Sequence, residues 1–207
     1  ASCLVGSEMC IRDRDKLLNL YLNDKIPEGV APFADFFRVV VDESLFAPQA
    51  SPERKSWGFQ VLHRTLAHAS EDVLPFLFTP HVMRTWVNQL SVPDRLLHSM
   101  AQKTVSLVGE AVKRSPTAGI ALVTQLTGEH GRQNFDRVTH TKTIESILSS
   151  LDEEGLQRYL AYLRDIIYAP TSAAPEDAKS IAMQRQSACD QMPVSYTHLR
   201  AHETRGN

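Results

Sequence analysis

Residues 91–116 read SVPDRLLHSMAQKTVSLVGEAVKRSP and carry the clearest helical pattern in the chain. Ser91 and Asp94 have the spacing of a capping box, with an acid in place of the usual Glu, and Pro93 falls in the first turn. Apolar residues then recur every three or four positions, at Leu96, Leu97, Met100, Ala101, Leu107, Val108, Ala111 and Val112. We therefore expect a helix of roughly 30 Å that begins at Ser91 and ends before Pro116.

A hydroxyl residue followed by proline, which is a common start of a helix, occurs three more times. These pairs are Ser51-Pro52, Thr79-Pro80 and Ser115-Pro116. An apolar stripe follows each pair, and two further stripes begin near Ile144 and Leu156. No segment shows the alternation of a strand. The pattern predicts an all-α fold, an irregular armadillo/HEAT-like helical repeat or α-solenoid, and a plain helical bundle is the alternative.

The two ends of the chain are related through their codons. One codon choice for residues 4–13 has a reverse complement that translates as VSYTHLRAHE, which is residues 194–203. The pairing extends outward to Ala1 with Gly206 and inward to Arg14 with Pro193, and this DNA resembles a transposase-type sequencing adapter. We therefore expect residues 1–14 and 193–207 to be non-native ends that do not pack on the core. Residues 15–192 are then a helical repeat fragment of a larger protein.

Cysteine usage and charge within residues 15–192 limit the classes of function. Cys189 is the single cysteine of this range, so an internal disulfide is impossible, which fits a reducing compartment. Residues 84–142 have an excess of Lys and Arg between two acidic flanks, and this balance is far from that of a dedicated nucleic-acid domain. No apolar run approaches the length of about 18 residues that a membrane span requires.

The segment of residues 127–141, TGEHGRQNFDRVTHT, differs from the rest of the chain because it has two glycines, no helical stripe and a basic excess. Loops of this length are often functional or disordered. The interpretation that we favour is a structural loop that Phe135 anchors to the core. The alternative is a nucleic-acid contact in which Arg132, Arg137 and Lys142 bind phosphates.

Three stretches together resemble one protein family. They are SPERKSWGFQVL at residues 51–62, LFTPHVMRTWVNQLSVPDRLLHSMAQK at 77–103 and LTGEHGRQNFDRVTHTKTIESIL at 126–148. They are similar to the DNA polymerase phi family, the large nucleolar proteins that include DNA polymerase V and the Myb-binding proteins. The resemblance implies an armadillo-like protein of the nucleus and nucleolus, with a role in ribosomal RNA gene transcription and ribosome assembly. It also implies nucleolar protein partners and DNA binding.

The family name suggests a DNA-directed DNA polymerase, but the residues do not support this function. Two-metal nucleotidyl transfer requires carboxylates that a rigid scaffold holds around a pair of Mg²⁺ ions. The densest acidic cluster, residues 152–154, is better explained as the charged N-terminus of a helix. Walker and G-x-S-x-G motifs are both missing from the sequence. We therefore expect no catalytic site, no cofactor and no small-molecule substrate.

The histidines and tryptophans are expected to have structural roles. His63 and His68 lack the four-residue spacing of a helical metal pair, and the other histidines lie on separate elements, so no metal site is expected. Trp57 and Trp86 both fall on apolar stripes, which favours core packing over base stacking. The order of likelihood is a protein-binding scaffold, then a nucleic-acid-binding segment, then an enzyme.

Overall fold

The computed structural model describes residues 16, 18–21, 29–70, 72–128, 130–132, 134–169 and 175–205, and every regular element within these ranges is a helix. The all-α prediction is therefore confirmed. The elements are α2 (Phe33–Phe36), the π-helix η1 (Phe37–Leu45), α3 (Pro52–His68), the 3₁₀-helix η2 (Leu74–Leu77), α4 (Pro80–Leu90), α5 (His98–Arg114), α6 (Pro116–Thr127), α7 (Phe135–Thr139), α8 (Thr143–Ser150), α9 (Glu153–Tyr168) and α10 (Pro175–Arg205).

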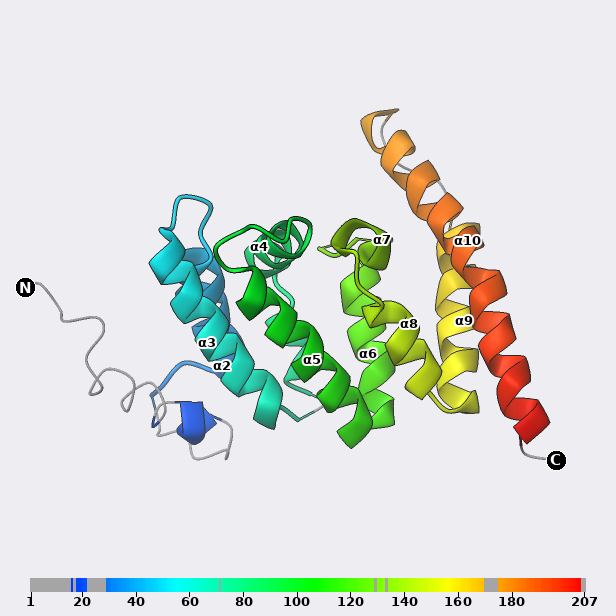
Figure 1. Cartoon of the computed structure of the whole chain (residues 1–207), viewed down its shortest axis with the longest axis horizontal. Coiled ribbons are helices and arrows are strands. Elements are labelled where there is room, and N and C mark those ends of the chain that lie inside the picture. The colour runs from blue at the N-terminus through cyan, green and yellow to red at the C-terminus, as the bar shows by residue number, and fades with distance from the viewer. Residues whose placement is uncertain are drawn as a thin grey trace, which may run out of the picture.

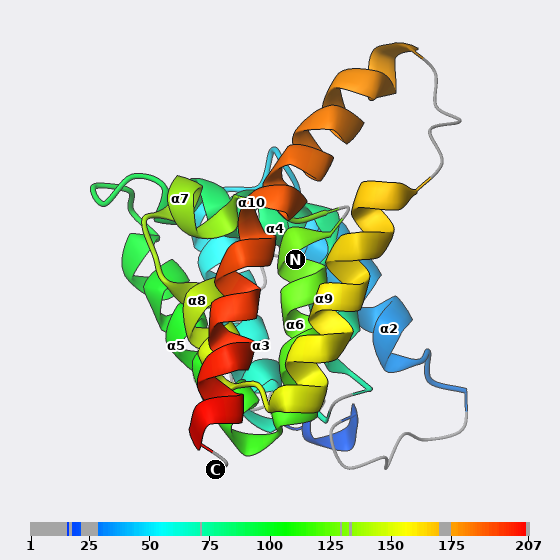
Figure 2. The same cartoon turned by 90° about the vertical axis from the view of Figure 1, so that its right-hand side faces the viewer.

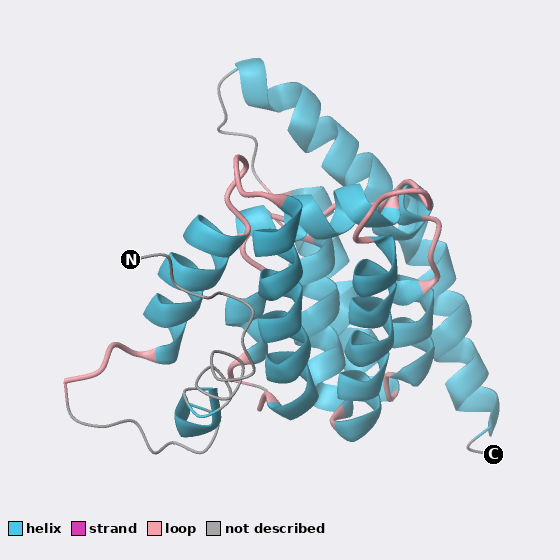
Figure 3. Ribbon diagram, turned by 60° about the vertical axis from the view of Figure 1, so that its left-hand side comes forward, coloured by secondary structure: helices cyan, strands magenta, loops and turns pink. Residues whose placement is uncertain are grey.

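The helices form an array in which chain order follows the long axis (Figure 1). One row contains α3, α5, α8 and α10, each in contact with the next. A second row contains η1, η2, α6 and α9, also in contact one after the other. Cross-contacts pair η1 with α3, α5 with both α4 and α6, α6 with α8, and α9 with α10. Figure 2 views this array from its α9–α10 end, and Figure 3 shows that loops join the helices at their ends.

The core runs without interruption along the array, and Trp86 lies near its middle. The Trp86 side chain is fully buried, and its ring centroid lies 5.1 Å from that of Phe135 and 6.0 Å from that of Phe78. Its Nε1–H donates to the Ala101 carbonyl over 2.9 Å. The prediction for Trp86 is confirmed. The prediction for Trp57 is wrong, because its neighbours on α3 take the buried face and Trp57 stays partly exposed outside the core.

The start of α5 differs from the prediction. The helix begins at His98, and residues 91–97 form turns in which Leu96 is 79% exposed. The cause lies on α4, where the Gln89 side chain accepts a hydrogen bond from the Leu97 N–H over 3.2 Å. The Gln89 carbonyl also lies 2.9 Å from His98 Nδ1. These contacts hold the turn against α4, so the local capping-box pattern at Ser91 does not start the helix.

The other hydroxyl–proline starts are found where the sequence places them, but their caps differ. Ser51 caps α3 by accepting a hydrogen bond from the Arg54 N–H over 3.3 Å. At α4, Thr79 does not accept a hydrogen bond and instead donates its hydroxyl to Asp42 Oδ1 over 2.6 Å.

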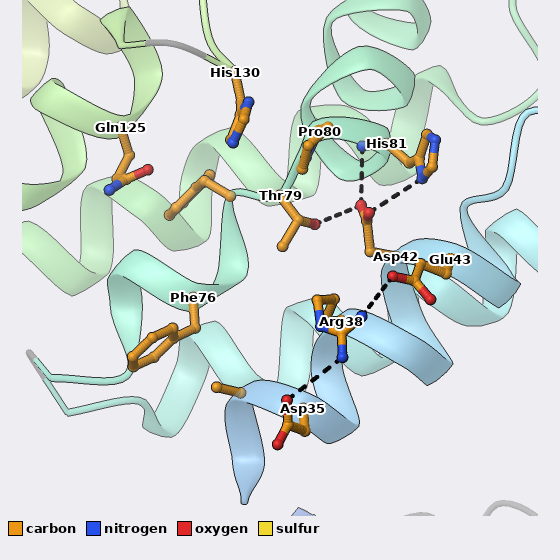
Figure 4. A pocket seen from close by; sticks show the side chains of 12 residues that line it. Asp35, Arg38, Asp42, Glu43, Phe76, Thr79, Pro80, His81, Gln125 and His130 are labelled. Carbon is orange, nitrogen blue, oxygen red and sulfur yellow. Dashed lines mark hydrogen bonds and ion pairs between the residues drawn. The ribbon is translucent and has the colours of Figure 1, made fainter.

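Asp42 provides the cap of α4 from the neighbouring helix η1. Its Oδ1 also accepts from the backbone N–H of His81 over 2.9 Å (Figure 4) and from that of Val82 over 3.0 Å. The Asp42 side chain is almost completely buried. A carboxylate far upstream in the sequence therefore satisfies the exposed donors at the first turn of α4.

The expectation that the C-terminal end does not pack on the core is wrong at Ser195 and Leu199. Residues 193–205 continue α10, where Ser195 is fully buried and Leu199 packs against the core. Ala188 and Ser195 are seven residues apart, as are Met192 and Leu199, so the same helix face carries on into the predicted non-native end. The origin of this end stays a prediction. Residues 1–14 lie outside the part of the chain that the structure describes.

Two glycines in helix interiors should respond to alanine in opposite ways. A Cβ at Gly58 would lie 2.7 and 2.9 Å from two ring atoms of Phe46, which is itself buried, whereas nothing lies within 4 Å of a Cβ at Gly109. We expect Gly58→Ala to lower the free energy of unfolding by about 1–3 kcal/mol through this overlap. Gly109→Ala should raise it by about 0.5–1 kcal/mol through helix propensity alone. Urea unfolding of both variants measures the difference, and equal stability would contradict the packing at Gly58.

His63 should make stability depend on pH. Its ring is buried between α3 and α5, with Nε2 3.0 Å from both the Met100 carbonyl and Thr104 Oγ1. Burial lowers the pKa of His63 from 6.5 to about 4. Between these values the unfolded chain binds a proton that the folded chain does not bind. We therefore expect the free energy of unfolding to fall by about 1–2 kcal/mol from pH 7 to pH 5.

The measurement for His63 is urea unfolding at both pH values for the parent and for His63→Gln, which keeps a donor but does not titrate. Acidic residues shared by both proteins contribute equally, so the pH dependence of the variant should be smaller. An identical loss in both proteins would assign the effect to other groups.

Candidate nucleic-acid interface

The structure brings together two of the three residues predicted to contact nucleic acid. Arg132 and Arg137 both line a cleft of about 800 Å³ between the segment of residues 128–137 and the helices α9 and α10. Lys142 is not part of the lining. Its Nζ lies 3.6 Å from Glu145 Oε2 on α8, in an exposed ion pair. We call the hollow at Arg132 and Arg137 the arginine cleft.

A tight backbone turn positions Arg132. The Arg132 N–H donates to the Leu126 carbonyl over 2.8 Å, and the Gly131 N–H donates to the Gly128 carbonyl over 3.0 Å. A Cβ at Gly131 would lie 2.0 Å from the Leu126 carbonyl oxygen, so only glycine permits this close approach. The second glycine of GEHG is therefore required by the fold of the loop.

Phe135 anchors the segment, as predicted, because its side chain is fully buried against Trp86. The segment is not a plain loop, however, since residues 135–139 form the short helix α7. His140 ends α7 in the left-handed conformation, with φ of 55°. Arg137 thus projects from a helical turn with a buried anchor two residues before it.

Asp136 fixes α7 relative to α8. Its Oδ1 accepts from the Ile144 N–H over 3.0 Å, and its Oδ2 accepts from the Glu145 N–H over 3.1 Å. The Thr141 hydroxyl donates to the same carboxylate over 3.3 Å. The residue at the N-cap position of α8 is Lys142, whose side chain has no acceptor, so the cap has to come from elsewhere. Sequence reasoning missed this role, although the lack of an acceptor at Lys142 was a usable signal.

The arginine cleft joins charged and apolar groups. Among the described residues, the structure records neither a hydrogen bond nor an ion pair for the guanidinium of Arg132 or Arg137. The helices α9 and α10 contribute apolar groups to the lining, which are Tyr162 and Ile166 of α9 and Met183 of α10, and Met183 is 65% exposed. We call these three residues the apolar wall. Polar groups of Asn134, Gln184, Gln186, Ser187 and Asp190 complete the lining. The cleft can therefore bind an anion and an apolar side chain at the same time.

The acidic cluster at residues 152–154 has the structural role that the sequence predicts. Asp152 caps α9, since its Oδ1 accepts from the Gly155 N–H over 2.8 Å. Glu154 pairs with Arg158 one turn later on the exposed face of α9. Within the described residues no group of three His, Cys, Asp or Glu side chains is arranged to hold a metal ion.

A second cleft, of about 710 Å³, lies where η1, the start of α4 and the end of α6 meet (Figure 4). Its charges are mostly paired with each other. Arg38 Nη1 lies 2.8 Å from Glu43 Oε1, a five-residue spacing that the π-helix aligns, and Arg38 Nη2 lies 3.6 Å from Asp35 Oδ1. His81 Nδ1 lies 3.1 Å from Asp42 Oδ2 but outside hydrogen-bond geometry. This cleft therefore offers a ligand fewer unpaired charges than the arginine cleft does.

Two further features are a cysteine and the character of the helices. The Cys189 thiol on α10 is free and exposed. Among the described helices, none combines the length and the apolar character that crossing a membrane would need.

Comparison with known proteins identifies relatives along most of the chain. The family model described as DNA polymerase phi matches residues 14–205, a range that runs past the predicted boundary at Met192. The chain is 37% identical over 168 residues to the rDNA transcriptional regulator pol5 of Schizosaccharomyces pombe, which covers 81% of this chain and 18% of that protein. It is 29% identical over 188 residues to the rDNA transcriptional regulator POL5 of Saccharomyces cerevisiae, covering 89% of this chain and 17% of the relative. No solved structure matches the chain. The chain spans less than a fifth of the length of either relative.

Proposed function

The chain belongs to the DNA polymerase phi family, and we propose from this membership that it acts as a helical scaffold segment of a nucleolar regulator of ribosomal RNA gene transcription. The observation that carries the proposal is the similarity to two yeast proteins, both described as rDNA transcriptional regulators, over most of this chain. The proposal includes nucleolar proteins of rRNA transcription and ribosome assembly as partners. It places the protein in the nucleus and nucleolus.

We further propose that the array is an irregular helical repeat of the armadillo or HEAT kind. The support is the packing of the helices in successive pairs, with η1 against α3, α4 against α5, α6 against α8 and α9 against α10. Each such pair contacts its neighbours along the chain, as the units of a solenoid do. Solenoids commonly bind partner proteins along such an extended surface, which suits a scaffold.

A chimaera tests the proposed function. Residues 15–192 replace the matching segment of the fission yeast relative, and the synthesis of precursor rRNA is measured by pulse labelling. We expect the chimaera to sustain synthesis and to accumulate in the nucleolus, whereas a version with Trp86→Ala, which disrupts the core, should not. A parent chimaera that is expressed and folded but fails to support synthesis would refute the proposal.

We propose that the segment has no polymerase activity of its own. Two carboxylates that could otherwise bind a metal ion have capping roles instead, since Asp136 caps α8 and Asp152 caps α9. In a primer-extension assay with Mg²⁺ or Mn²⁺ we expect no incorporation above background from the purified chain. Incorporation that co-purifies with the chain and disappears in Asp136→Ala or Asp152→Ala would contradict this expectation.

A further inference from the structure

We propose that the arginine cleft binds an acidic segment of a partner protein that also carries apolar side chains. This inference rests on the proposed scaffold function and names the kind of partner for one surface of it. The alternative occupant is a nucleic-acid backbone, which the sequence alone suggested for the same arginines. The lining of the cleft decides between them.

The first argument is the state of the two guanidiniums. Arg132 comes from the glycine turn and Arg137 from α7, so the anchors Gly131 and Phe135 hold both backbones in place. No side chain among the described residues pairs with either arginine. Planar guanidiniums bind carboxylates in a bidentate manner, so two of them on one wall suit two acidic side chains of a peptide.

The second argument is the apolar wall that lines the cleft together with the arginines. Tyr162, Ile166 and the largely exposed Met183 face the same hollow. A phosphate backbone gains nothing from thioether and aliphatic groups, whereas the apolar side chains of a peptide would bury them. Exposed methionine is common on surfaces that bind peptides, because its flexible side chain adapts to the ligand.

The third argument concerns the surrounding charges. Asp190 lies in the lining with both arginines, and Glu145 lines a neighbouring hollow together with Arg137 and Asp190, so carboxylates lie near the arginines. A continuous polyanion such as duplex DNA would be repelled by these carboxylates. A peptide can place its charges selectively, with carboxylates at the arginines and a backbone N–H towards Asp190.

The experiment measures fluorescence anisotropy with the full chain. The probe is a short labelled peptide in which a Phe-Leu pair has one Glu on each side and the other residues are uncharged. We expect saturable binding that the Arg132→Ala/Arg137→Ala double variant weakens about tenfold or more, which corresponds to about 1.4 kcal/mol. Lys142→Ala is the matched control, because it removes the same charge outside the cleft, and its affinity should equal that of the parent. Both arginines are exposed, so circular dichroism should show unchanged folding.

Two further arms test the chemistry of the cleft. Arg132→Glu/Arg137→Glu should reverse the preference, so that a Lys-rich peptide with the same Phe-Leu pair binds instead. Met183→Ser should lower the affinity for the Phe-Leu peptide several-fold. A control peptide with Ser-Ser in place of Phe-Leu should bind the parent more weakly, and Met183→Ser should not change its affinity. Equal effects on both peptides would remove the apolar wall from the proposal.

Duplex DNA provides the opposing outcome. The surface is a nucleic-acid interface if DNA binds more tightly than the peptide and the slope of log affinity against log salt is about −3. Each of the Arg132, Arg137 and Lys142 variants should then make this slope shallower by about one. Absence of peptide binding by the parent, or equal binding by the double variant, also overturns the proposal. These failures are distinct from a failure of the parent chimaera, which would refute the scaffold function whatever the cleft binds.

Discussion

Replacing Trp86 with Ala is expected to lower the free energy of unfolding by about 3–5 kcal/mol, which is a large part of the stability of an ordinary domain. The indole is fully buried and contacts Phe78 and Phe135, so its removal would leave a cavity where α4, α7 and η2 meet. The Ala101 carbonyl would also lose its hydrogen bond from the indole N–H. Both effects act in the same direction, because one removes packing contacts and the other removes a buried side-chain hydrogen bond.

The chain provides its own control for the Trp86 variant. Trp57 is the second tryptophan, it is partly exposed, and it lies outside the core cluster. Trp57→Ala should lower the free energy of unfolding by less than about 1.5 kcal/mol. Urea unfolding followed by far-ultraviolet circular dichroism compares the two variants without depending on tryptophan fluorescence. Similar losses in both would mean that Trp86 does not occupy the packed site described above.

Replacing Asp42 with Ala is expected to lower the free energy of unfolding by about 2–4 kcal/mol. One buried carboxylate accepts from the Thr79 hydroxyl and from the N–H groups of His81 and Val82. Alanine would leave all three donors without this acceptor at a partly buried helix start. Asn keeps one acceptor oxygen, so Asp42→Asn should lose less than Asp42→Ala.

Asp35→Ala is the matched control for Asp42. It removes the same charge from an exposed carboxylate nearby, whose ion pair with Arg38 spans 3.6 Å on the surface. Exposed pairs of this kind contribute less than about 1 kcal/mol. Thermal and urea unfolding of the three variants measures the order. Equal losses for Asp35→Ala and Asp42→Ala would show that charge, rather than capping, sets the stability here.

The sequence predicted helix caps correctly where the capping side chain and the backbone N–H that it binds lie within one turn of each other. Ser51 caps α3 and Asp152 caps α9, both through hydrogen bonds to a residue three positions later. The same reasoning failed at Ser91, because Gln89 on the preceding helix holds residues up to Leu97 in turns. It missed Asp42 and Asp136 as caps, since the donors that they satisfy lie about 40 and 8 residues away in the chain.

In the candidate site, too, the sequence indicated the residues that belong to one short segment and missed those that meet only in the folded structure. Arg132 and Arg137 stood out in the sequence because they belong to one short basic segment with glycines and a single aromatic anchor. Lys142 directly follows this segment, yet its side chain pairs with Glu145 at the start of α8, which no local pattern indicates. The apolar wall of Ile166 and Met183 comes from helices further along the chain and meets the arginines only in the folded array.

The family segments can also be explained in structural terms. In NFDRVTHTKT, Phe135 provides the anchor and Asp136 the cap of α8. One hydrogen bond joins the hydroxyls of Thr139 and Thr141 over 2.8 Å. In ERKSWGF, Gly58 makes room for the ring of Phe46. Both stretches therefore specify how one helix meets the next, and the arginines are placed as a result.

The caps that Asp42 and Asp136 supply across element boundaries have a consequence for how the array unfolds. A stack of helix pairs that touch only through apolar faces tends to lose its terminal units one at a time, because each unit depends only on its neighbour. Here η1 holds the first turn of α4, and α7 holds the first turn of α8, through carboxylates that would lose their partners if either element opened. Opening one unit therefore raises the free energy of the next unit as well. Hydrogen exchange should accordingly report joint, cooperative opening of η1 with α4 and of α7 with α8, rather than fraying helix by helix.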